Sequence, residues 1–282
     1  MMISNYSFIE FKFVAVLISL LIWIVLSALY AFTKYWRKKA GWALFMYGRN
    51  ARWREEREYA ARLALLAGNK EATKLYALAC PEKFDNELPL TPFYRNNIKC
   101  VFADYYYPKR YYDWIAEEQW LFNRTVYQFK EGRDNCTQYF AQVFRTLQPA
   151  CELTIMFMPC SSEKRYRERF SSLGLFFLKF KDVHSGIDYI SFICDRECKH
   201  LADKRGEIDE TSNYIISDAV LGKKVVIVDD LLTTGRSLST YAECLKKSGA
   251  EVIGAIFLAK TFMVPSDFKI KWVIWKQIFF SW

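Results

Sequence analysis

The chain has 282 residues, and its 40 Lys and Arg against 31 Asp and Glu leave a formal net charge of +9. Its 11 Gly and 7 Pro are too few for a collagen-like or low-complexity chain, and 52% hydrophobic residues are enough to bury a core. Only two histidines occur, His184 and His200. This scarcity argues against a histidine-rich metal site, an HExxH protease and a Ser-His-Asp hydrolase.

An uncharged segment near the N-terminus, residues 13–32, predicts a transmembrane helix. As a helix it spans about 30 Å, the thickness of a bilayer core. The basic and aromatic residues at 34–39 are typical of a cytoplasmic interface. We therefore predict a single-pass membrane protein with an anchor over 1–40, a short external N-terminus and a cytoplasmic catalytic domain. A cleaved signal peptide and a buried core helix are the alternatives, but no cleavage site is clear and the segment is long for a core helix.

Residues 41–82 predict a helical spacer. Tyr59, Leu63 and Leu66 recur at helical spacing, and a Gly-Asn pair at 68–69 separates two helices. The outline resembles one tetratricopeptide-like hairpin, although a single unit of that kind cannot bury its own face. We favour a spacer that packs on its own body or on a partner, and we do not expect direct nucleic-acid binding.

Eight cysteines are spread along the chain without the dense spacing of a secreted disulfide framework. Cys194, Cys198 and His200 could ligate zinc, but no second pair of ligands lies near them in the sequence. Reduced, structural cysteines are therefore favoured over a metal site.

One segment carries the chemistry. Residues 225–228, Val-Val-Ile-Val, predict a buried parallel strand that ends at two carboxylates, Asp229 and Asp230. A loop of hydroxyl residues and glycine, 233–237, comes next, and a helical pattern and a second apolar run over 252–259 follow it. This is a strand-loop-helix-strand unit, in which ligands bind beyond the carboxyl ends of the strands.

The loop has the groups that bind a phosphate. Gly235 lets the backbone approach a ligand, hydroxyls stand on both sides of it, and the amides that open the next helix favour an anion. Two adjacent acids cannot bind phosphate, but they can accept hydrogen bonds from vicinal hydroxyls or hold a hydrated Mg²⁺. Both chemistries in one loop predict a sugar phosphate as the ligand.

Residues 225–237, VVIVDDLLTTGRS, resemble the phosphoribosyl-diphosphate signature of type I phosphoribosyltransferases. The resemblance implies that Asp229 and Asp230 are catalytic and hold the ribose 2′ and 3′ hydroxyls, with Mg²⁺ bound through water or these hydroxyls. It implies an α/β fold with a parallel sheet flanked by helices, here preceded by one transmembrane helix and a helical spacer. The residues that it assigns to the 5′-phosphate are Thr233, Thr234, Gly235, Arg236 and Ser237.

A second apolar run, 153–158, predicts another strand, and a cationic segment follows it. A pyrophosphate leaving group needs cations and backbone amides at such a strand end. The residues we assign to pyrophosphate are Ser161, Lys164, Arg165 and Arg167. A solvated basic helix start is the alternative. We expect a third strand over 187–194, and the polar stretch 195–213 as the flap that closes over the substrate.

Two segments also resemble the ComF branch of the family. In residues 158–170, the end of a strand is followed by Pro and by an Arg-rich turn that opens a helix. Residues 127–132 contain an aromatic-Lys-x-Gly pattern. The resemblance covers about residues 96–261. Two features depart from it: ComF-type proteins usually begin with a cysteine-rich zinc-binding segment, and Thr233 stands where 6-oxopurine phosphoribosyltransferases carry an acid. The second departure argues against hypoxanthine or guanine as the acceptor.

Two aromatic segments have more than one interpretation. The tyrosines at 105–107, with others at 111–112, could stack on a base, but we favour packing in the core or hood. The C-terminal tail, 263–282, could be an edge strand or an aromatic-basic segment at the membrane surface. The phosphoribosyltransferase-like domain then covers 83–262.

We expect a membrane-anchored phosphoribosyltransferase that uses phosphoribosyl diphosphate and Mg²⁺ and transfers phosphoribose to a nitrogen nucleophile that the sequence does not identify. The alternative is a non-catalytic, ComF-type module that binds a phosphoribosyl or nucleotide ligand in DNA uptake, nucleotide sensing or defence at the membrane. A homodimer is left open.

The net charge divides unevenly along the chain. Residues 1–80 hold 12 Lys and Arg against 5 Asp and Glu, whereas residues 81–282 hold 28 against 26. The excess lies beside the predicted membrane helix, where topology and anionic lipid explain it. We therefore interpret the basic composition as a membrane signal and not as a nucleic-acid signal.

Overall fold

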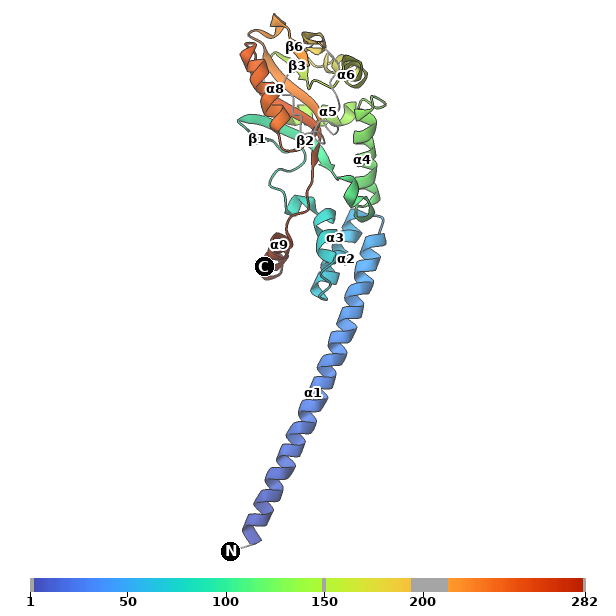
Figure 1. The fold of residues 1–282 in the computed structure, drawn as a ribbon, viewed down its shortest axis with the longest axis vertical. Helices are drawn as coiled ribbons and strands as arrows, with labels where there is room; N and C mark the ends of the chain where they lie inside the picture. Colours follow the sequence, from blue (N-terminus) through green and yellow to red (C-terminus); the bar gives the residue numbers. More distant parts are fainter. Residues whose placement is uncertain (1–2, 149–150, 194–212, 281–282) are drawn as a thin grey trace.

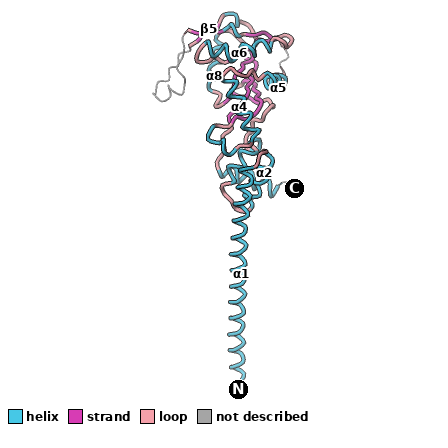
Figure 2. Tube along the Cα trace, turned by 90° about the vertical axis from the view of Figure 1, so that its right-hand side faces the viewer, coloured by secondary structure: helices cyan, strands magenta, loops and turns pink. Residues whose placement is uncertain are grey.

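The computed structural model describes residues 3–148, 151–193 and 213–280. A long N-terminal helix, α1 (Ile3–Asn50), extends away from a body that contains the remaining described elements (Figure 1, Figure 2). The sheet lies in the half of the body that is farther from the N-terminus of α1 (Figure 1).

The elements of the body follow in chain order. Its described α-helices are α2 (Arg54–Leu66), α3 (Ala72–Ala79), α4 (Glu117–Lys130), α5 (Thr137–Leu147), α6 (Glu163–Phe177), α8 (Arg236–Lys247) and α9 (Asp267–Phe280). Its described strands are β1 (Phe93–Arg95), β2 (Ile98–Tyr106), β3 (Leu153–Phe157), β4 (Val183–Ser185), β5 (Ile190–Phe192), β6 (Tyr214–Ile216), β7 (Lys224–Leu232) and β8 (Glu251–Thr261). Short 3₁₀ helices cover η1 (Pro81–Lys83), η2 (Lys109–Trp114), η3 (Ile187–Tyr189) and η5 (Asp218–Val220).

Helix α1 contains the predicted membrane span. The side chains from Leu17 to Ala40 are exposed. Within the part of the chain that the structure describes, α1 is the one helix long and apolar enough to cross a membrane, and its apolar window is not buried inside the protein. This exposure argues against a helix in the core of the chain.

The last turns of α1 pack closely against α2. A Cβ added to Gly48 would lie 2.8 Å from the Cβ of Ala60, and one added to Gly41 would lie 3.1 Å from the Cβ of Ala67. Glycines on α1 therefore let the two helix backbones approach more closely than larger side chains would allow.

The helix predicted from the spacing of Tyr59, Leu63 and Leu66 is confirmed as α2, but these residues do not form its buried face. Tyr59 is 66% exposed and Leu66 is 48% exposed. Close contact with the glycines of α1 selects small side chains, so the buried apolar face consists of Ala60, Ala61 and Ala64. The predicted interruption between the two spacer helices is confirmed at Gly68, whose φ is +91°.

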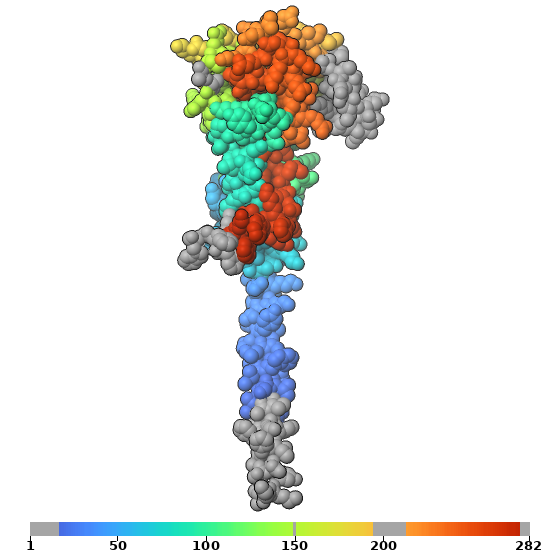
Figure 3. All heavy atoms as spheres, turned by 90° about the vertical axis from the view of Figure 1, so that its left-hand side faces the viewer, coloured from blue at the N-terminus to red at the C-terminus, as the bar shows by residue number. Residues whose placement is uncertain are grey.

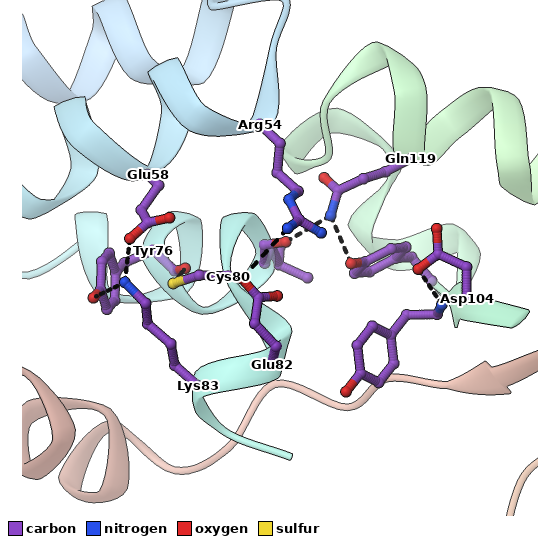
Figure 4. Close-up of polar contacts among 11 residues, drawn as sticks. Arg54, Glu58, Tyr76, Cys80, Glu82, Lys83, Asp104 and Gln119 are labelled. Atoms are coloured by element: carbon purple, nitrogen blue, oxygen red, sulfur yellow. Dashed lines mark hydrogen bonds and ion pairs between the residues drawn. The ribbon is translucent and has the colours of Figure 1, made fainter. Parts of the chain in front are cut away.

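The spacer helices pack on their own body, as we favoured. Figure 4 shows the polar contacts where α2 and α3 meet α4 and β2. Gln119 on α4 donates to the carbonyl oxygen of Leu78 over 2.8 Å and to Oη of Tyr107 over 2.6 Å. Arg54 on α2 donates to Glu82 over 3.4 Å. These contacts join the spacer to the first long strand.

A six-stranded sheet with the order β1-β2-β8-β7-β3-β4 forms the centre of the body. β1 and β2 are antiparallel, and every other pair is parallel. Residues 225–228 of β7 are fully buried, as expected for a β-branched strand covered by helices on both faces. The expected fold class, a mainly parallel sheet flanked by helices and preceded by one long apolar helix, is confirmed.

Two strand predictions need correction. β7 does not stop at the two acids but continues to Leu232. The strand predicted over 187–194 is instead η3 followed by β5, which pairs with β6 in a separate two-stranded sheet. The chain leaves the main sheet at Gly186, where a Cβ would lie 2.3 Å from Sδ of Met156. A residue with a Cβ would not fit at this position, directly after the end of β4.

Residues 267–280 form α9, so the edge-strand alternative for the tail is wrong. The predicted flap and the Cys194, Cys198 and His200 trio lie outside the described residues, except for Asn213.

Candidate functional site

The predicted site lies where β3 ends beside β7, which itself continues to Leu232. β7 pairs with β3 in parallel register, with Phe157 opposite Val228. The amide of Met158 donates to the carbonyl oxygen of Val228 over 2.9 Å. Because the carboxyl ends of parallel strands meet at one edge of the sheet, the loops at 158–162 and 233–237 are brought together.

Asp230 is the more buried member of the acid pair, with 6% of its surface exposed. Its Oδ2 lies 3.1 Å from Nη1 of Arg169 on α6 and 3.9 Å from Nζ of Lys130 on α4. Nη2 of Arg169 also donates to the main-chain oxygen of Lys130 over 3.0 Å. A buried carboxylate needs such partners, because an unpaired charge in this environment is costly.

Asp229 is half-buried at the same strand end. Its Oδ1 accepts a hydrogen bond from the main-chain N–H of Asp230 over 2.8 Å. Burial, followed by the negative charge of Asp230, raises the pKa of Asp229 to about 7, although Arg169 and Lys130 act in the opposite direction. The Asp229 carboxyl therefore exchanges its proton near neutral pH, and a ligand that needs the carboxylate must displace that proton.

The five residues predicted for phosphate lie together at one helix start, because α8 begins at Arg236. Thr233, Thr234 and Ser237 are exposed, and Gly235 is buried. The main-chain N–H of Arg236 donates to Oγ1 of Thr234 over 3.4 Å. The first amides of a helix have no acceptor within the helix, which makes this end suitable for an anion.

Gly235 also marks a close approach between distant segments. Its φ is +80°, and a Cβ there would lie 3.0 Å from Cγ of Arg95 on β1. Nη2 of Arg95 contacts the two carboxylate oxygens of Glu87 at 2.6 and 2.8 Å. Sequence reasoning missed Arg95, because it belongs to a three-residue strand that carries no motif.

The start of α6 holds two of the residues predicted for pyrophosphate. Oγ of Ser162 accepts a hydrogen bond from the main-chain N–H of Arg165 over 3.3 Å and so caps the helix. Nη1 of Arg165 donates to Oγ of Ser161 over 3.5 Å. Ser161 and Arg165 therefore lie at the end of β3, beside the acid pair on β7.

The other two predicted cations form ion pairs on the surface of α6. Nζ of Lys164 lies 3.9 Å from Glu168, and Nε of Arg167 lies 3.6 Å from Glu163, with Asp188 as a further partner. Exposed pairs of this kind contribute little to stability and exchange readily. Both side chains can leave these partners for a more highly charged ligand.

Sequence reasoning did not assign Lys130 and Arg169 to the site. Lys130 lies in the aromatic-Lys-x-Gly segment, and Arg169 lies one helical turn after Arg165 in the cationic run. Both signals were therefore present. What the sequence could not indicate is which cation points towards Asp230, because that depends on how α4 and α6 pack against the sheet.

The tyrosine run packs in the core, as we favoured. Tyr105 and Tyr107 are 1% and 2% exposed. Oη of Tyr106 lies 2.8 Å from Oη of Tyr127 on α4. These rings fix α4, and with it Lys130, against the sheet.

The donor set at the acid pair was tested against a metal ion. Across residues 3–148, 151–193 and 213–280, no group of three or more His, Cys, Asp or Glu side chains could hold a metal. Asp229 and Asp230 provide two carboxylates, one of them paired with Arg169. Mg²⁺ is commonly held by one or two carboxylates together with water and substrate oxygens, so the two acids fit an ion that arrives with a phosphorylated ligand.

Comparison with known proteins defines the class of this fold. Residues 198–267 match the family model of the phosphoribosyl transferase domain. The parallel sheet flanked by helices is an α/β arrangement consistent with that family's fold.

Curated relatives agree with this class over short stretches. The chain is 45% identical over 53 residues to an adenine phosphoribosyltransferase of Gluconobacter oxydans, which is 18% of this chain and 30% of the relative. It is 54% identical over 35 residues to an orotate phosphoribosyltransferase of Staphylococcus aureus, 12% of this chain and 17% of the relative. It is 47% identical over 51 residues to a putative ribose-phosphate pyrophosphokinase of Enterococcus faecalis, which is 17% of this chain and 15% of the relative. The chain thus spans less than a third of the length of these relatives.

Replacing Gly235 by Ala tests whether the loop at 233–237 binds phosphate. We expect at least about 10-fold weaker binding of ribose 5-phosphate in titration calorimetry, because the left-handed backbone is strained by a Cβ and the loop must move away from Arg95. Gly222→Ala is the matched control, since Gly222 has φ +70° with nothing within 4 Å of its Cβ position. Equal losses of affinity in the two variants would contradict a binding role for this loop.

Proposed function

We propose that the protein is a membrane-anchored phosphoribosyltransferase of the ComF-like type. It uses phosphoribosyl diphosphate and Mg²⁺ and transfers phosphoribose to a nitrogen nucleophile that has yet to be identified. The observation that carries the proposal is the meeting of a helix-start phosphate loop, an acid pair and cations at adjacent strand ends. The name of each of these relatives refers to a phosphorylated ribose, which supports a ribose phosphate as the ligand.

The two acids have different roles in the proposed complex. Asp229 is the more accessible carboxylate and accepts hydrogen bonds from the ribose 2′ and 3′ hydroxyls. Asp230 is already paired with Arg169, so it holds that cation and Lys130 at the strand end. The 5′-phosphate binds at the start of α8, among Thr233, Thr234, Gly235, Arg236 and Ser237.

The reaction requires charge stabilisation at the leaving group. The nitrogen lone pair attacks the anomeric carbon, the bond from that carbon to the pyrophosphate oxygen breaks, and its electron pair leaves with pyrophosphate. The proton that the nitrogen loses passes to the departing pyrophosphate or to solvent. Arg165 and Ser161 lie at the end of β3 where they donate to the departing oxygens, and Lys164 and Arg167 join them on release from their surface pairs. When bound, Mg²⁺ would neutralise phosphate charge beside Asp229 and Asp230.

One observation favours a second candidate, a non-catalytic ligand-binding module. Two of the three cations assigned to pyrophosphate already pair with acids, Lys164 with Glu168 and Arg167 with Glu163. A site that binds ribose phosphate without holding a leaving group would have this arrangement. Nucleotide sensing, DNA uptake or defence at the membrane would then be its context.

Titration calorimetry of the full chain in detergent, with phosphoribosyl diphosphate and Mg²⁺, tests the proposal. We expect saturable binding that is lost when Asp229 and Asp230 are both replaced by Ala. Absence of binding, or binding unchanged in the double variant, would refute both functions. Pyrophosphate release with a panel of bases and nucleotides then separates the two candidates, because turnover with any acceptor excludes a pure binding module.

A further inference from the structure

The C-terminal helix α9 lies at the end of the body from which α1 extends (Figure 1, Figure 3). It packs against α3, and it is fixed there by Ile270 and Ile274, which are 0% and 8% exposed. Nζ of Lys269 donates to the main-chain oxygen of Phe84 over 2.9 Å. Contacts with α3 and with Phe84 thus hold this helix against the body.

The opposite side of α9 is aromatic and exposed. Phe268 is 79% exposed, Trp272 48% and Trp275 43%. Their spacing of four and three residues places them on one helix face, roughly opposite Ile270 and Ile274. The two indole rings are stacked, with centroids 5.3 Å apart.

Lysines border this aromatic face. Lys271 and Lys276 are exposed on either side of it, and Nζ of Lys276 lies 5.5 Å from the ring centroid of Trp272. A helix with two opposite apolar faces buries only one of them against its own body, and the other face remains exposed. Tryptophan beside lysine is the composition found where a helix lies in the headgroup region of an anionic bilayer.

α1 carries a similar group of side chains on the same end of the body. Nζ of Lys39 lies 4.9 Å from the ring centroid of Tyr35 and 5.6 Å from that of Trp36. Arg37 donates to the carbonyl oxygen of Ala67, in the turn that leads into α3, over 3.4 Å. The turn before α3, the helix that contacts α9, therefore lies beside the part of α1 where we expect the membrane interface.

We propose that the aromatic face of α9 (Phe268, Trp272 and Trp275) lies on an anionic lipid surface as a second membrane contact beside α1. This inference rests on the membrane anchoring proposed above. β8 runs parallel to β7 and leads through a short segment into α9. The carboxyl ends of the parallel strands, where Asp229 and Gly235 lie, are thus the ends nearer α9. Lipid contact by α9 orients these strand ends relative to the bilayer.

Tryptophan quenching by brominated lipids in nanodiscs that hold the full chain tests the proposal. The double variant Trp272→Phe, Trp275→Phe keeps the face apolar. The fluorescence that it loses relative to wild type is the signal of α9. Trp120→Phe isolates a control on α4 that is 41% exposed, and Trp23→Phe isolates one on α1 that is 67% exposed. In discs of anionic lipid we expect the α9 signal to be quenched at least about 2-fold more than the Trp120 signal.

The outcomes are distinct. Quenching of Trp23 together with an α9 signal that matches Trp120 would overturn this proposal and leave the anchor intact. Quenching of neither would overturn both. Protection of the α9 signal from aqueous iodide without quenching by lipid would mean that a protein surface, such as a second copy, covers this face, which also overturns the proposal. If the α9 signal is quenched as strongly in neutral discs as in anionic discs, the preference for anionic lipid is refuted. The same holds if the double variant Lys271→Glu, Lys276→Glu is quenched as strongly as wild type in anionic discs.

Discussion

Raising the pH from 6 to 8 will strengthen the binding of ribose 5-phosphate by about 10-fold beyond the change due to the ligand itself, because in the proposed complex the ionised Asp229 carboxylate accepts hydrogen bonds from the ribose hydroxyls. Burial and the neighbouring charge of Asp230 raise the pKa of Asp229 to about 7, so half of the unliganded protein carries the proton near neutrality. Titration calorimetry at both pH values measures the effect.

Asp229→Asn supplies the control for this prediction. The phosphate of the ligand itself titrates near pH 6. The variant keeps that contribution but removes the ionisable carboxyl, so the difference between the two proteins isolates Asp229. We also expect binding about 10- to 100-fold weaker than wild type at pH 8, because hydrogen bonds to a charged acceptor are lost. Equal pH dependence in the two proteins would contradict the role assigned to Asp229.

The same proton affects stability in the opposite direction. The pKa of Asp229 in the folded protein is raised above the ordinary value of an aspartate. The folded state therefore binds more protons than the unfolded state between about pH 4 and pH 7, and the free energy of unfolding falls as the pH rises through that window. Affinity should thus increase with pH while the stability of the unliganded protein decreases.

Replacing Arg169 by Ala will cause a large loss of stability, about 3–5 kcal/mol, because it removes the nearest partner of a buried carboxylate. Asp230 is 6% exposed, and its remaining cation, Lys130, is 3.9 Å away. Chemical unfolding of the full chain in one detergent measures the change.

Two further variants show whether the loss comes from the pair. Asp230→Asn in the Arg169→Ala background should recover much of the stability, since a neutral amide is less costly to bury alone. Arg167→Ala is the matched control on the same helix, and we expect a change of about 0–1 kcal/mol because its ion pairs are exposed. A large loss in the control, or no recovery in the double variant, would contradict the assignment.

Some features of the fold follow from local sequence. The buried strand at 225–228 is visible because four successive apolar residues, three of them valine, suit a position covered on both faces. The break at Gly68 and the loop at Gly235 are visible because only glycine adopts a positive φ without strain. The long apolar run within α1 requires no partner to be recognised.

Other features depend on contacts between distant segments. The alanine face of α2 exists because α1 presents glycines to it. The requirement for glycine at position 186 comes from its close approach to Met156 on the neighbouring strand. The place of the tail helix depends on Ile270 and Ile274 packing beside α3, a partner that lies far away in the sequence.

The sequence by itself determined which chemical groups the candidate site contains: an acid pair, a hydroxyl-rich glycine loop and a cationic strand end, each recognisable because it is continuous in the chain. Only the tertiary structure decided how these parts act on one another. Burial and charge differ for adjacent residues on one strand, so Asp230 is paired with Arg169 while Asp229 is left with a raised pKa. Electrostatic interactions depend on distance in space and on exclusion of water, and neither can be read from the order of residues.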